Sequence, residues 1–468
     1  MKHPLHYKDL EVVVIGLAKS GQAVAQTMHK YGAKVTVNDL KPRSSSPEAE
    51  PLEKLGIQVI CGEHPADLIH PGVALVIKNP GIPYFADPVK RAIELGIEVV
   101  TEVEVSSFLT EAPIIGITGS NGKTTTTTWV GQMLKAGGLQ PVVAGNIGRP
   151  LCDAASNTTG DFWLVVELSS FQLKGTTDFK PHIGCLLNIA ETHLDYHGDM
   201  ADYQASKLKL FANQTKDNFS ILNADDAYCQ EILPQLNGTV VLFSVTQDLP
   251  DGFCMASDNE GIEWLVRKAN GTVADWICPA EEVGILGRYN IENALAAAAI
   301  AWASGVQVNV IGQVIRDFRG VEHRLEFVAK TNDVSYYNNS KATNAQASIK
   351  ALQAFKEKVI WIGGGLDRGS DYMELLPHFK DKVKAAVIIG ETKEKIRHVA
   401  ELAGIADIQL IDGGKEEAAQ VIHQAVKAAT QFAKPGDVVL LSPACASWDM
   451  FTSYEVRGRI FKEAVHNI

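Results

Sequence analysis

The sequence lacks any apolar run long enough to cross a membrane. A spanning helix needs about 20 consecutive apolar residues, and the alanine-rich stretch at residues 294–303 falls well short of this. The N-terminal residues also lack the apolar core and the small-residue cleavage site of a signal peptide. We therefore expect a cytoplasmic protein with no membrane partner.

Paired cysteines and an excess of positive charge are absent as well. The seven cysteines, at positions 61, 152, 185, 229, 254, 278 and 445, include no C-x-x-C pair, which favours reduced thiols over disulfides or a zinc site. Lys and Arg number 43 against 55 Asp and Glu, which gives a net charge of −12. Because sequence-independent binding of nucleic acid requires a basic face, no nucleic-acid partner is expected.

Strand-like and helix-like segments alternate along almost the whole chain, which predicts parallel α/β units. The length of 468 residues exceeds what one hydrophobic core usually organises. We predict an α/β protein of three domains, at residues 1–101, 102–320 and 321–468. Strands are predicted at Val12–Gly16, Val35–Asn38, Ile114–Thr118, Trp163–Glu167, Ile183–Asn188, Val359–Ile362, Ala385–Ile389 and Val438–Leu441. The shorter, more polar pattern between Leu222 and Trp276 predicts a hairpin-rich insertion.

A glycine-rich turn follows the predicted strand Ile114–Thr118 and leads into a predicted helix. The turn consists of Gly119, Ser120, Asn121, Gly122, Lys123, Thr124 and Thr125. Such a turn offers backbone N–H groups to phosphates, while the lysine reaches the terminal phosphates and a threonine hydroxyl can ligate Mg²⁺. The spacing departs from G-x-x-x-x-G-K-[ST], because position 117 is Ile. The alternative is a glycine-rich turn with an incidental lysine.

Two further residues are candidates for the metal site that a phosphate loop requires. Glu167 ends a predicted strand, at the edge where open parallel sheets bind ligands, although a capping or salt-bridge glutamate is the alternative. His193 and His197 have the spacing of a zinc-binding helix, but Leu194 stands where the general base would be, so that interpretation fails. His193 stays a candidate for a magnesium shell, although Mg²⁺ prefers oxygen ligands. His197 is expected at the surface or behind the site.

The first and third segments carry weaker signals. A turn from Gly16 to Gly21 follows a strand and Asp39 ends the next one, as in dinucleotide-binding folds, but Ala18 replaces the middle glycine. This pattern favours a nucleotide or another phosphate-bearing ligand over NAD specifically, and a plain strand–helix turn is the alternative. Polar clusters at residues 338–344 and 441–449 suit carboxylate or ribose contacts, although solvated turns explain each equally well. Cys445 is expected to be a buried thiol rather than a nucleophile.

Taken together, these motifs resemble those of the Mur ligases over essentially the whole chain. The phosphate loop and the segments Gly145–Gly148, Glu167–Gln172 and Gly287–Asn293 resemble the wider family. Ser340–Asn344 and Ser442–Ser447 resemble the members that add D-glutamate. The resemblance implies a Rossmann-like N-terminal domain, a P-loop-type central ATPase domain and a Rossmann-like C-terminal domain that closes over the nucleotide. A monomer is expected.

The resemblance implies an ADP-forming ligase that uses ATP to add D-glutamate to UDP-N-acetylmuramoyl-L-alanine, through an acyl phosphate, in peptidoglycan precursor synthesis. ATP and two Mg²⁺ ions are the implied cofactors. Two alternatives are open. One is another family member, which adds L-alanine, a diamino acid or a glutamate on folate. The other is a nucleotide-dependent regulator that hydrolyses ATP without making a ligated product.

The resemblance also assigns residues to each ligand. ATP would contact the phosphate loop, including the catalytic Lys123, together with Asn290, Asn293, Arg324, Asn339 and Lys341. The UDP-substrate would contact Leu17, Ala18, Lys19, Ser20, Asp39, Lys41, Gly81, Asn146 and His193. D-Glutamate would contact Thr343, Arg368, Ser447 and Tyr454. The metal ions would be held by Thr124, Glu167, His193 and Lys207.

Lys207 matches the family lysine that reacts with CO₂ to form a carbamate, whose oxygens suit a hard cation better than an ammonium does. Without the resemblance, Lys207 would be predicted as an ordinary lysine on a helix surface. One departure from the family pattern is Asn339, where Asp is usual; Asn keeps a carbonyl acceptor but loses the charge. Leu40 and Lys41 stand where relatives carry Thr and Arg, and Lys lacks the planar bidentate contact that Arg makes with phosphate.

Overall fold

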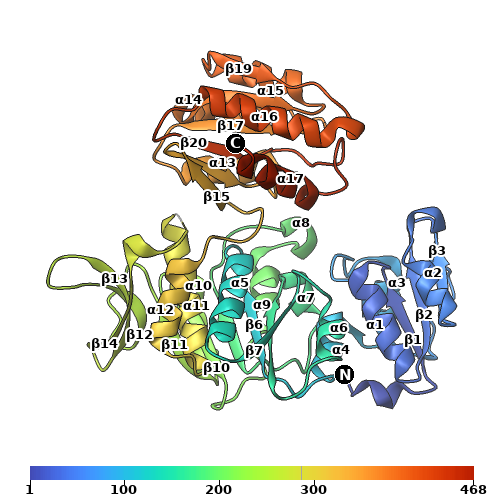
Figure 1. The fold of residues 1–468 in the computed structure, drawn as a ribbon. Coiled ribbons are helices and arrows are strands. Elements are labelled where there is room, and N and C mark those ends of the chain that lie inside the picture. The colour runs from blue at the N-terminus through green and yellow to red at the C-terminus, as the bar shows by residue number, and fades with distance from the viewer. Residues whose placement is uncertain (286) are drawn as a thin grey trace. The chain divides into compact units, whose positions relative to one another are not determined.

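Three β-sheets, each flanked by helices, form the computed structural model, which describes residues 1–285 and 287–468 apart from the side chain of Asp195 (Figure 1). The chain divides into two compact units. Met1–Val283 with Arg288–Asp317 holds the first two sheets, and Gly284–Gly287 with Phe318–Ile468 holds the third. The prediction of an α/β protein is confirmed. Within the described part of the chain, no helix combines the length and the apolar character needed to span a bilayer.

The N-terminal sheet is parallel throughout, in the order β3-β2-β1-β4-β5. Its strands are β1 (Glu11–Ile15), β2 (Lys34–Asp39), β3 (Gln58–Cys61), β4 (Val73–Lys78) and β5 (Val99–Val100), and its helices are α1 (Lys19–Lys30), α2 (Ala49–Lys54) and α3 (Asp87–Glu94), with α4 (Glu102–Ser107) after them. The apolar strand β1 is buried between two core clusters. Since β2 and β4 lie on opposite sides of β1, the turns after β1 and β4 meet at a topological switch point, where parallel sheets bind ligands.

The central sheet has nine strands in the order β14-β13-β12-β11-β10-β9-β6-β8-β7. They are β6 (Ile114–Thr118), β7 (Gln140–Gly145), β8 (Phe162–Glu167), β9 (Ile183–Leu186), β10 (Phe219–Asn223), β11 (Thr239–Phe243), β12 (Gly252–Ser257), β13 (Glu263–Ala269) and β14 (Thr272–Pro279). The hairpin-rich insertion predicted between Leu222 and Trp276 included too many residues. Strands β10 and β11 are parallel members of the sheet, and only β12 to β14 pair in antiparallel fashion. Each of β10 and β11 is short and bounded by polar turns, which gave their sequence a hairpin-like pattern.

The helices of the central part are α5 (Lys123–Ala136), α6 (Leu151–Ala155), α7 (Ser170–Lys174), α8 (Leu194–His197), α9 (Met200–Leu208), α10 (Ala227–Ile232), α11 (Arg288–Ala303) and α12 (Val308–Asp317). The alanine-rich helix α11 is buried along residues 294–301, as predicted for a packed helix, and lies against α5 (Figure 1). Small alanine side chains permit this close approach. The approach brings the first turns of α11 beside the phosphate loop.

The third sheet has the order β15-β16-β20-β17-β18-β19, and all its pairs are parallel except β15 with β16. Its strands are β15 (Glu326–Thr331), β16 (Val334–Asn338), β17 (Val359–Gly364), β18 (Val383–Ile389), β19 (Asp407–Leu410) and β20 (Val438–Leu441), and its helices are α13 (Ala345–Gln353), α14 (Leu376–Lys382), α15 (Lys393–Leu402), α16 (Ala418–Phe432) and α17 (Tyr454–His466). Helices cover both faces and form two core clusters. The polar clusters predicted from the sequence follow β16 and β20, which are neighbours.

Candidate active site

The phosphate loop joins β6 to α5 in the parallel part of the central sheet, where β6 lies between β8 and β9. The loop requires glycine at Gly122, whose φ is 82° and whose Cβ, if present, would lie 2.1 Å from Asn293 Oδ1. Because α5 begins at Lys123, its first turn directs backbone N–H groups and the positive end of the helix dipole toward the loop. This arrangement suits a phosphate group.

Two lysine ammonium groups converge on one carbonyl of this loop. Lys123 Nζ donates to Gly119 O at 2.8 Å, and Lys207 Nζ donates to the same oxygen at 2.9 Å and to Thr118 Oγ1 at 3.1 Å. Lys207 is only 1% exposed, so the interpretation of it as a surface lysine is wrong. Burial, reinforced by the neighbouring Lys123 and opposed by Glu167, lowers the pKa of Lys207 well below its usual value.

The rest of the loop is held by hydrogen bonds to neighbouring segments. Ser120 Oγ accepts from Ala190 N at 2.8 Å, and Asn121 N donates to Asn188 Oδ1 at 2.9 Å. The side chain of Thr124 is buried at the first turn of α5, and Thr125 beside it is partly buried. These contacts fix the loop before any ligand is present, which reduces the reorganisation that binding would require.

Asn290 and Asn293 lie on α11 against this loop. Asn293 Nδ2 donates to Asn290 Oδ1 at 3.1 Å, and Thr126 Oγ1 donates to Asn293 Oδ1 at 3.4 Å. Both asparagines are buried. The structure therefore brings these two predicted ATP contacts next to Gly122, although they stand far from it in the sequence.

Glu167 ends β8, the strand beside β6, as predicted for a group at the carboxyl edge of the sheet. Its Oε1 atom accepts from Asn146 Nδ2 at 2.8 Å, which brings together two predicted site residues. Its Oε2 atom is buried and, among the residues that the structure describes, finds no hydrogen-bond partner. A buried carboxylate oxygen without a partner is costly, and a cation would offset that cost.

His193 stands at the start of α8 with a left-handed backbone, at φ 58°. Its ring packs edge-on against Phe171, at 4.9 Å between centroids, and Phe171 lies on α7 shortly after Glu167. His197 is buried, so its predicted place at the surface is wrong. Its Nδ1 lies 2.6 Å from Asp202 Oδ2 and its Nε2 lies 2.9 Å from Ser170 Oγ, which fits the other prediction, a place behind the site.

The first turn of the N-terminal sheet is organised by Asp39. Leu17 N donates to Asp39 Oδ2 at 2.7 Å and Lys41 N donates to Asp39 Oδ1 at 2.8 Å, so the carboxylate ties the turns after β1 and β2 together. Ala18 and Lys19 are exposed at the start of α1, and Lys41 is also exposed.

The second turn of this sheet follows β4. Asn79 Nδ2 donates to Ser20 Oγ at 3.1 Å, and Gly81 N donates to Asn79 Oδ1 at 3.2 Å. One amide side chain therefore joins both turns, as expected at a switch point. The sequence interpretation included Ser20 and Gly81 but missed Asn79, because an isolated Asn after a strand has no distinctive pattern.

Asn339 follows β16 in the third sheet and uses both ends of its amide. Its Oδ1 accepts from Leu325 N at 3.2 Å, and its Nδ2 donates to Ser442 Oγ, which follows β20, at 3.0 Å. Lys341 lies nearby, with Nζ 5.4 Å from the centre of the Tyr454 ring. Arg324 precedes β15 in a short bridge with Val321.

The predicted amino-acid contacts surround the same edge of the third sheet. Arg368 lies beyond β17 and stacks on the exposed Trp448 at 5.1 Å, and Ser447 is buried in the loop after β20. Tyr454 begins α17, and Thr343 precedes α13 by two residues. The prediction of Cys445 as a buried thiol is confirmed, since it is 2% exposed and burial raises its pKa.

Arg457 links the two polar clusters and was missed in the sequence. It is fully buried on α17, and its Nη2 donates to Ser340 O at 2.9 Å and to Cys445 O at 3.1 Å. Burial lowers the pKa of Arg457 to about 10. A single guanidinium thus fixes the spacing between the loops that follow β16 and β20.

Three models of known protein families match successive segments of the chain. Residues 10–101 match a sequence model described as Mur ligase MurD-like, N-terminal domain; residues 117–301 match the Mur ligase middle domain; and residues 323–445 match the Mur ligase, glutamate ligase domain. The chain belongs to the Mur ligase family. The matched segments coincide with the three sheets.

Similar Mur ligases include two curated relatives named UDP-N-acetylmuramoylalanine--D-glutamate ligase. The protein of Geobacillus sp. (strain WCH70) is 47% identical over 100% of both chains, and that of Listeria monocytogenes serotype 4b (strain F2365) is 45% identical over 99% of this chain and 98% of its own. Among solved structures, UDP-N-acetylmuramate-alanine ligase MurC from Thermotoga maritima aligns with a TM-score of 0.56 at 20% identity, over 98% of this chain and 99% of its own. The MurF ligase from the same organism, in complex with ADP, aligns at 0.55 and 16% identity over 100% of both chains. These two structures share the fold.

Mur ligases use ATP and Mg²⁺, and the residues of this chain fit a hard cation. The buried, unpartnered Oε2 of Glu167 is an oxygen ligand of the kind that Mg²⁺ prefers. Within residues 1–285 and 287–468, Asp195 aside, no three His, Cys, Asp or Glu side chains form a metal cluster by themselves. An ion at Glu167 would therefore draw further ligands from hydroxyl groups such as that of Thr124 and from nucleotide phosphates, which is how Mg²⁺ is usually held.

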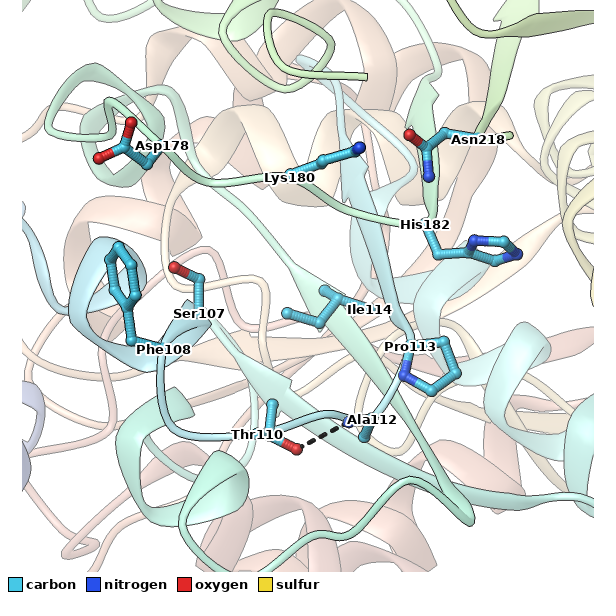
Figure 2. Close-up of a pocket in the computed structure, with 10 residues that line it drawn as sticks. All are labelled: Ser107, Phe108, Thr110, Ala112, Pro113, Ile114, Asp178, Lys180, His182 and Asn218. Carbon is cyan, nitrogen blue, oxygen red and sulfur yellow. Dashed lines mark hydrogen bonds between the residues drawn. The ribbon is translucent and has the colours of Figure 1, made fainter. Parts of the chain in front are cut away.

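A cavity of about 250 Å³ lies elsewhere in the first unit (Figure 2). Lys180 and Asn218 lie on one side of it, and Thr110 and Pro113 lie on the other. Ile114, which begins β6, also lines the cavity, whereas the phosphate loop follows the other end of that strand. The cavity is therefore separate from the candidate active site.

Proposed function

We propose that this Mur ligase joins D-glutamate to the alanyl carboxylate of UDP-N-acetylmuramoyl-L-alanine, with conversion of ATP to ADP and phosphate, as a step of peptidoglycan precursor synthesis. Full-length identity near 47% to a relative named for this reaction supports the substrates. The observation that carries the chemistry is the convergence of the phosphate loop, Lys123, Lys207 and the partly unsatisfied Glu167 at one edge of the central sheet.

The reaction requires that a carboxylate approach a triphosphate of the same charge. In the proposed mechanism, the alanyl carboxylate attacks the γ-phosphorus of ATP and ADP leaves, which gives an acyl phosphate. The amine of D-glutamate then attacks the acyl carbon, and the tetrahedral intermediate collapses to the amide and phosphate. Lys123 and the N–H groups at the start of α5 would neutralise the developing phosphate charge. The fixed loop would hold the groups in line for transfer.

Two Mg²⁺ ions are part of the proposal, with Thr124, Glu167, His193 and Lys207 as their protein ligands. When bound, the ions would supply charge neutralisation and alignment of the phosphate oxygens. Asn146, which donates to Glu167 Oε1, would orient that carboxylate so that Oε2 faces a cation. His193 would join from the start of α8.

We also propose that Lys207 carries a carbamate. As an ammonium, it shares the carbonyl of Gly119 with Lys123, and two like charges at one oxygen repel each other. Reaction of the neutral amine with CO₂ forms an N–C bond, releases a proton and replaces the positive charge by an anion. The carbamate would accept from Lys123 and would offer oxygen ligands to Mg²⁺.

The remaining substrates are assigned to the other two sheets. The uridine nucleotide would bind at the switch point of the N-terminal sheet, at the turns tied together by Asp39 and Asn79. The C-terminal edge, with Arg324, Asn339 and Lys341 for the nucleotide, would also hold D-glutamate. Its contacts would be Thr343, Arg368, Ser447 and Tyr454. We propose a monomeric, cytoplasmic enzyme that acts on small molecules.

The experiment that tests the proposal measures phosphate release from ATP and Mg²⁺ in the presence of UDP-N-acetylmuramoyl-L-alanine. D-Glutamate is compared with L-glutamate, L-alanine, a diamino acid and no amino acid. Release with D-glutamate alone, matched by an amide product, is the expected result. Release with a different amino acid would mean that the protein is a Mur ligase with another amino-acid substrate. Release without the acceptor would mean that it is an ATPase rather than a ligase.

A further inference from the structure

Lys78 is a buried lysine that none of the site assignments above uses. It ends β4 and is 1% exposed. Its Nζ donates to Tyr196 OH at 3.0 Å, to Pro80 O at 3.2 Å and to Asn79 O at 3.4 Å. Across the described chain, with Asp195 left aside, no carboxylate lies within ion-pair distance of it. Its hydrogen-bond partners in the described chain are therefore neutral oxygens.

Tyr196 connects this lysine to the central sheet. Its hydroxyl accepts from Lys78 and donates to Ile82 O at 3.3 Å, so it is hydrogen-bonded to the turn that contains Gly81. Its ring lies 4.4 Å from that of Phe171, and Phe171 in turn lies 4.9 Å from the ring of His193. A continuous set of contacts therefore leads from the turn after β4 to His193, the residue that precedes α8.

The surroundings of Lys78 make an ammonium costly at this place. Its Nζ lies 4.7 Å from the Tyr84 ring, and Lys174 Nζ lies 5.1 Å from the same ring. Lys174 pairs with Asp202, which also contacts His197. Burial and the nearby Lys174 lower the pKa of Lys78 to about 7. An apolar side chain of similar length would avoid this desolvation cost, so stability alone does not account for a lysine here.

We propose that Lys78 is a positioning residue that couples binding of the uridine-nucleotide acceptor to the placement of His193. It holds the carbonyls of the acceptor turn with two donors and the hydroxyl of Tyr196 with the third. An acceptor that orders the turn at Gly81 thereby orders α8, and with it His193. The inference rests on the proposed function, because it takes the turn at Gly81 as the acceptor site and His193 as part of the catalytic centre.

The test compares Lys78→Met, which removes the ammonium but keeps the length, with Tyr196→Phe, which removes only the hydroxyl, and with the double variant. Lys90→Met is the matched control, since Lys90 is exposed on α3 of the same domain. The KM values for acceptor, ATP and D-glutamate are measured by phosphate release. Acceptor binding is measured by calorimetry without ATP, and melting temperature is measured for each variant.

We expect Lys78→Met to raise the acceptor KM and Kd on the order of tenfold, as for loss of a charged hydrogen bond, with the ATP KM within about twofold of wild type. The melting temperature should change little, because removal of the buried charge is opposed by the loss of a donor to Asn79 O, Pro80 O and Tyr196 OH. Tyr196→Phe should show the same pattern more weakly, and the double variant should be no worse than Lys78→Met. Lys90→Met should match wild type.

Three results would overturn the inference: an unchanged acceptor Kd in Lys78→Met, equal increases in the KM of all three substrates, or fully multiplicative effects in the double variant. If Lys78→Met does not fold, Tyr196→Phe alone decides by the same acceptor readouts. Wild-type protein that releases no phosphate with acceptor and D-glutamate would instead contradict the proposed function. The two failures are therefore distinguishable.

Discussion

The carboxyl edges of the central and third sheets differ in how their charged groups are arranged. At the central edge, Lys123 and Lys207 share one carbonyl, and Glu167 keeps a buried oxygen without a partner in the described chain. At the C-terminal edge, the side chains around Asn339 are neutral amides and hydroxyls that bond to one another, while the buried Arg457 and the partly buried Asp449 lie in the neighbouring helix and loop. Asn339 donates to Ser442, which donates in turn to Ser348 at 2.9 Å.

This difference indicates a division of labour. Charged groups in buried surroundings are stabilised strongly by ligands of opposite charge, so the central edge is suited to a metal–nucleotide complex. The neutral network of Asn339, Ser442 and Ser348, whose members are bonded to one another, defines a fixed shape, which suits the selection of one small substrate. Under the proposed function, the central edge supplies the chemistry and the C-terminal edge supplies the specificity for the amino acid.

Among the variants that test this difference, Lys123→Ala is expected to have the largest effect on activity. Loss of the loop ammonium should lower turnover about a thousandfold, because its charge acts mainly where charge develops during phosphoryl transfer. Steady-state phosphate release gives kcat, and Lys135→Ala, on the exposed side of the same helix, should behave as wild type. Turnover within tenfold of wild type would remove Lys123 from the catalytic assignment.

A somewhat smaller loss, on the order of a hundredfold, is expected for Lys207→Ala, and it should be partly reversible. Added acetate or formate should restore part of the activity, since a small carboxylate can replace the oxygens of the carbamate. The activity of each variant is titrated against acetate, with Lys216→Ala, an exposed lysine, as control. A loss that no carboxylate rescues would contradict the carbamate.

Substitution of Asn339 tests the neutral network. Asn339→Ala should lower the free energy of unfolding of the C-terminal unit by about 1–3 kcal/mol, because Leu325 N and Ser442 Oγ each lose a buried partner. Asn339→Asp keeps the acceptor for Leu325 N and should lose less. In urea unfolding, the wild type should be the most stable of the three proteins, followed by Asn339→Asp and then Asn339→Ala. An Asp variant less stable than the Ala variant would mean that the negative charge, rather than the missing hydrogen bonds, dominates at this site.

The smallest effect is expected from Asp449, a partly buried carboxylate at the C-terminal edge. Burial raises its pKa, so between its unfolded and folded pKa values the folded protein binds more protons. Stability should therefore fall as pH rises through that interval, and the loss should persist above it. Asp449→Asn should remove this dependence and should be more stable than wild type at neutral pH. Melting curves from pH 4 to 8 give the difference, and a parallel pH dependence in both proteins would contradict it.

The sequence predicted those parts of the fold that depend on local pattern. Apolar strands followed by glycine-rich or polar turns identified the phosphate loop and the end of β8, because the carboxyl ends of parallel strands meet at one edge. The residues that complete the site depend on contacts between distant segments. Lys207 donates to Thr118, which lies 89 positions earlier, and Lys78 donates to Tyr196 across 118 positions. No periodicity within a helix or strand contains that information.

Buried polar groups that support other residues were the least predictable. Arg457 sits within an ordinary amphipathic helix, and its role is visible only when the loops after β16 and β20 are seen to meet it. His197 was expected at the surface or behind the site because one His in a short polar helix does not indicate what covers it. Asn79 and Lys78 were missed for the same reason. Sequence motifs therefore identify the residues that contact a ligand more readily than they identify the residues that hold those contact residues in place.

The most direct test of the account follows oxygen-18 placed in the alanyl carboxylate of the acceptor. The mechanism predicts that, with ATP, Mg²⁺ and D-glutamate, one labelled oxygen leaves in the inorganic phosphate while the amide forms, and that L-glutamate yields no amide. Phosphate that carries no label would contradict carboxylate activation, and with it the function proposed for this Mur ligase.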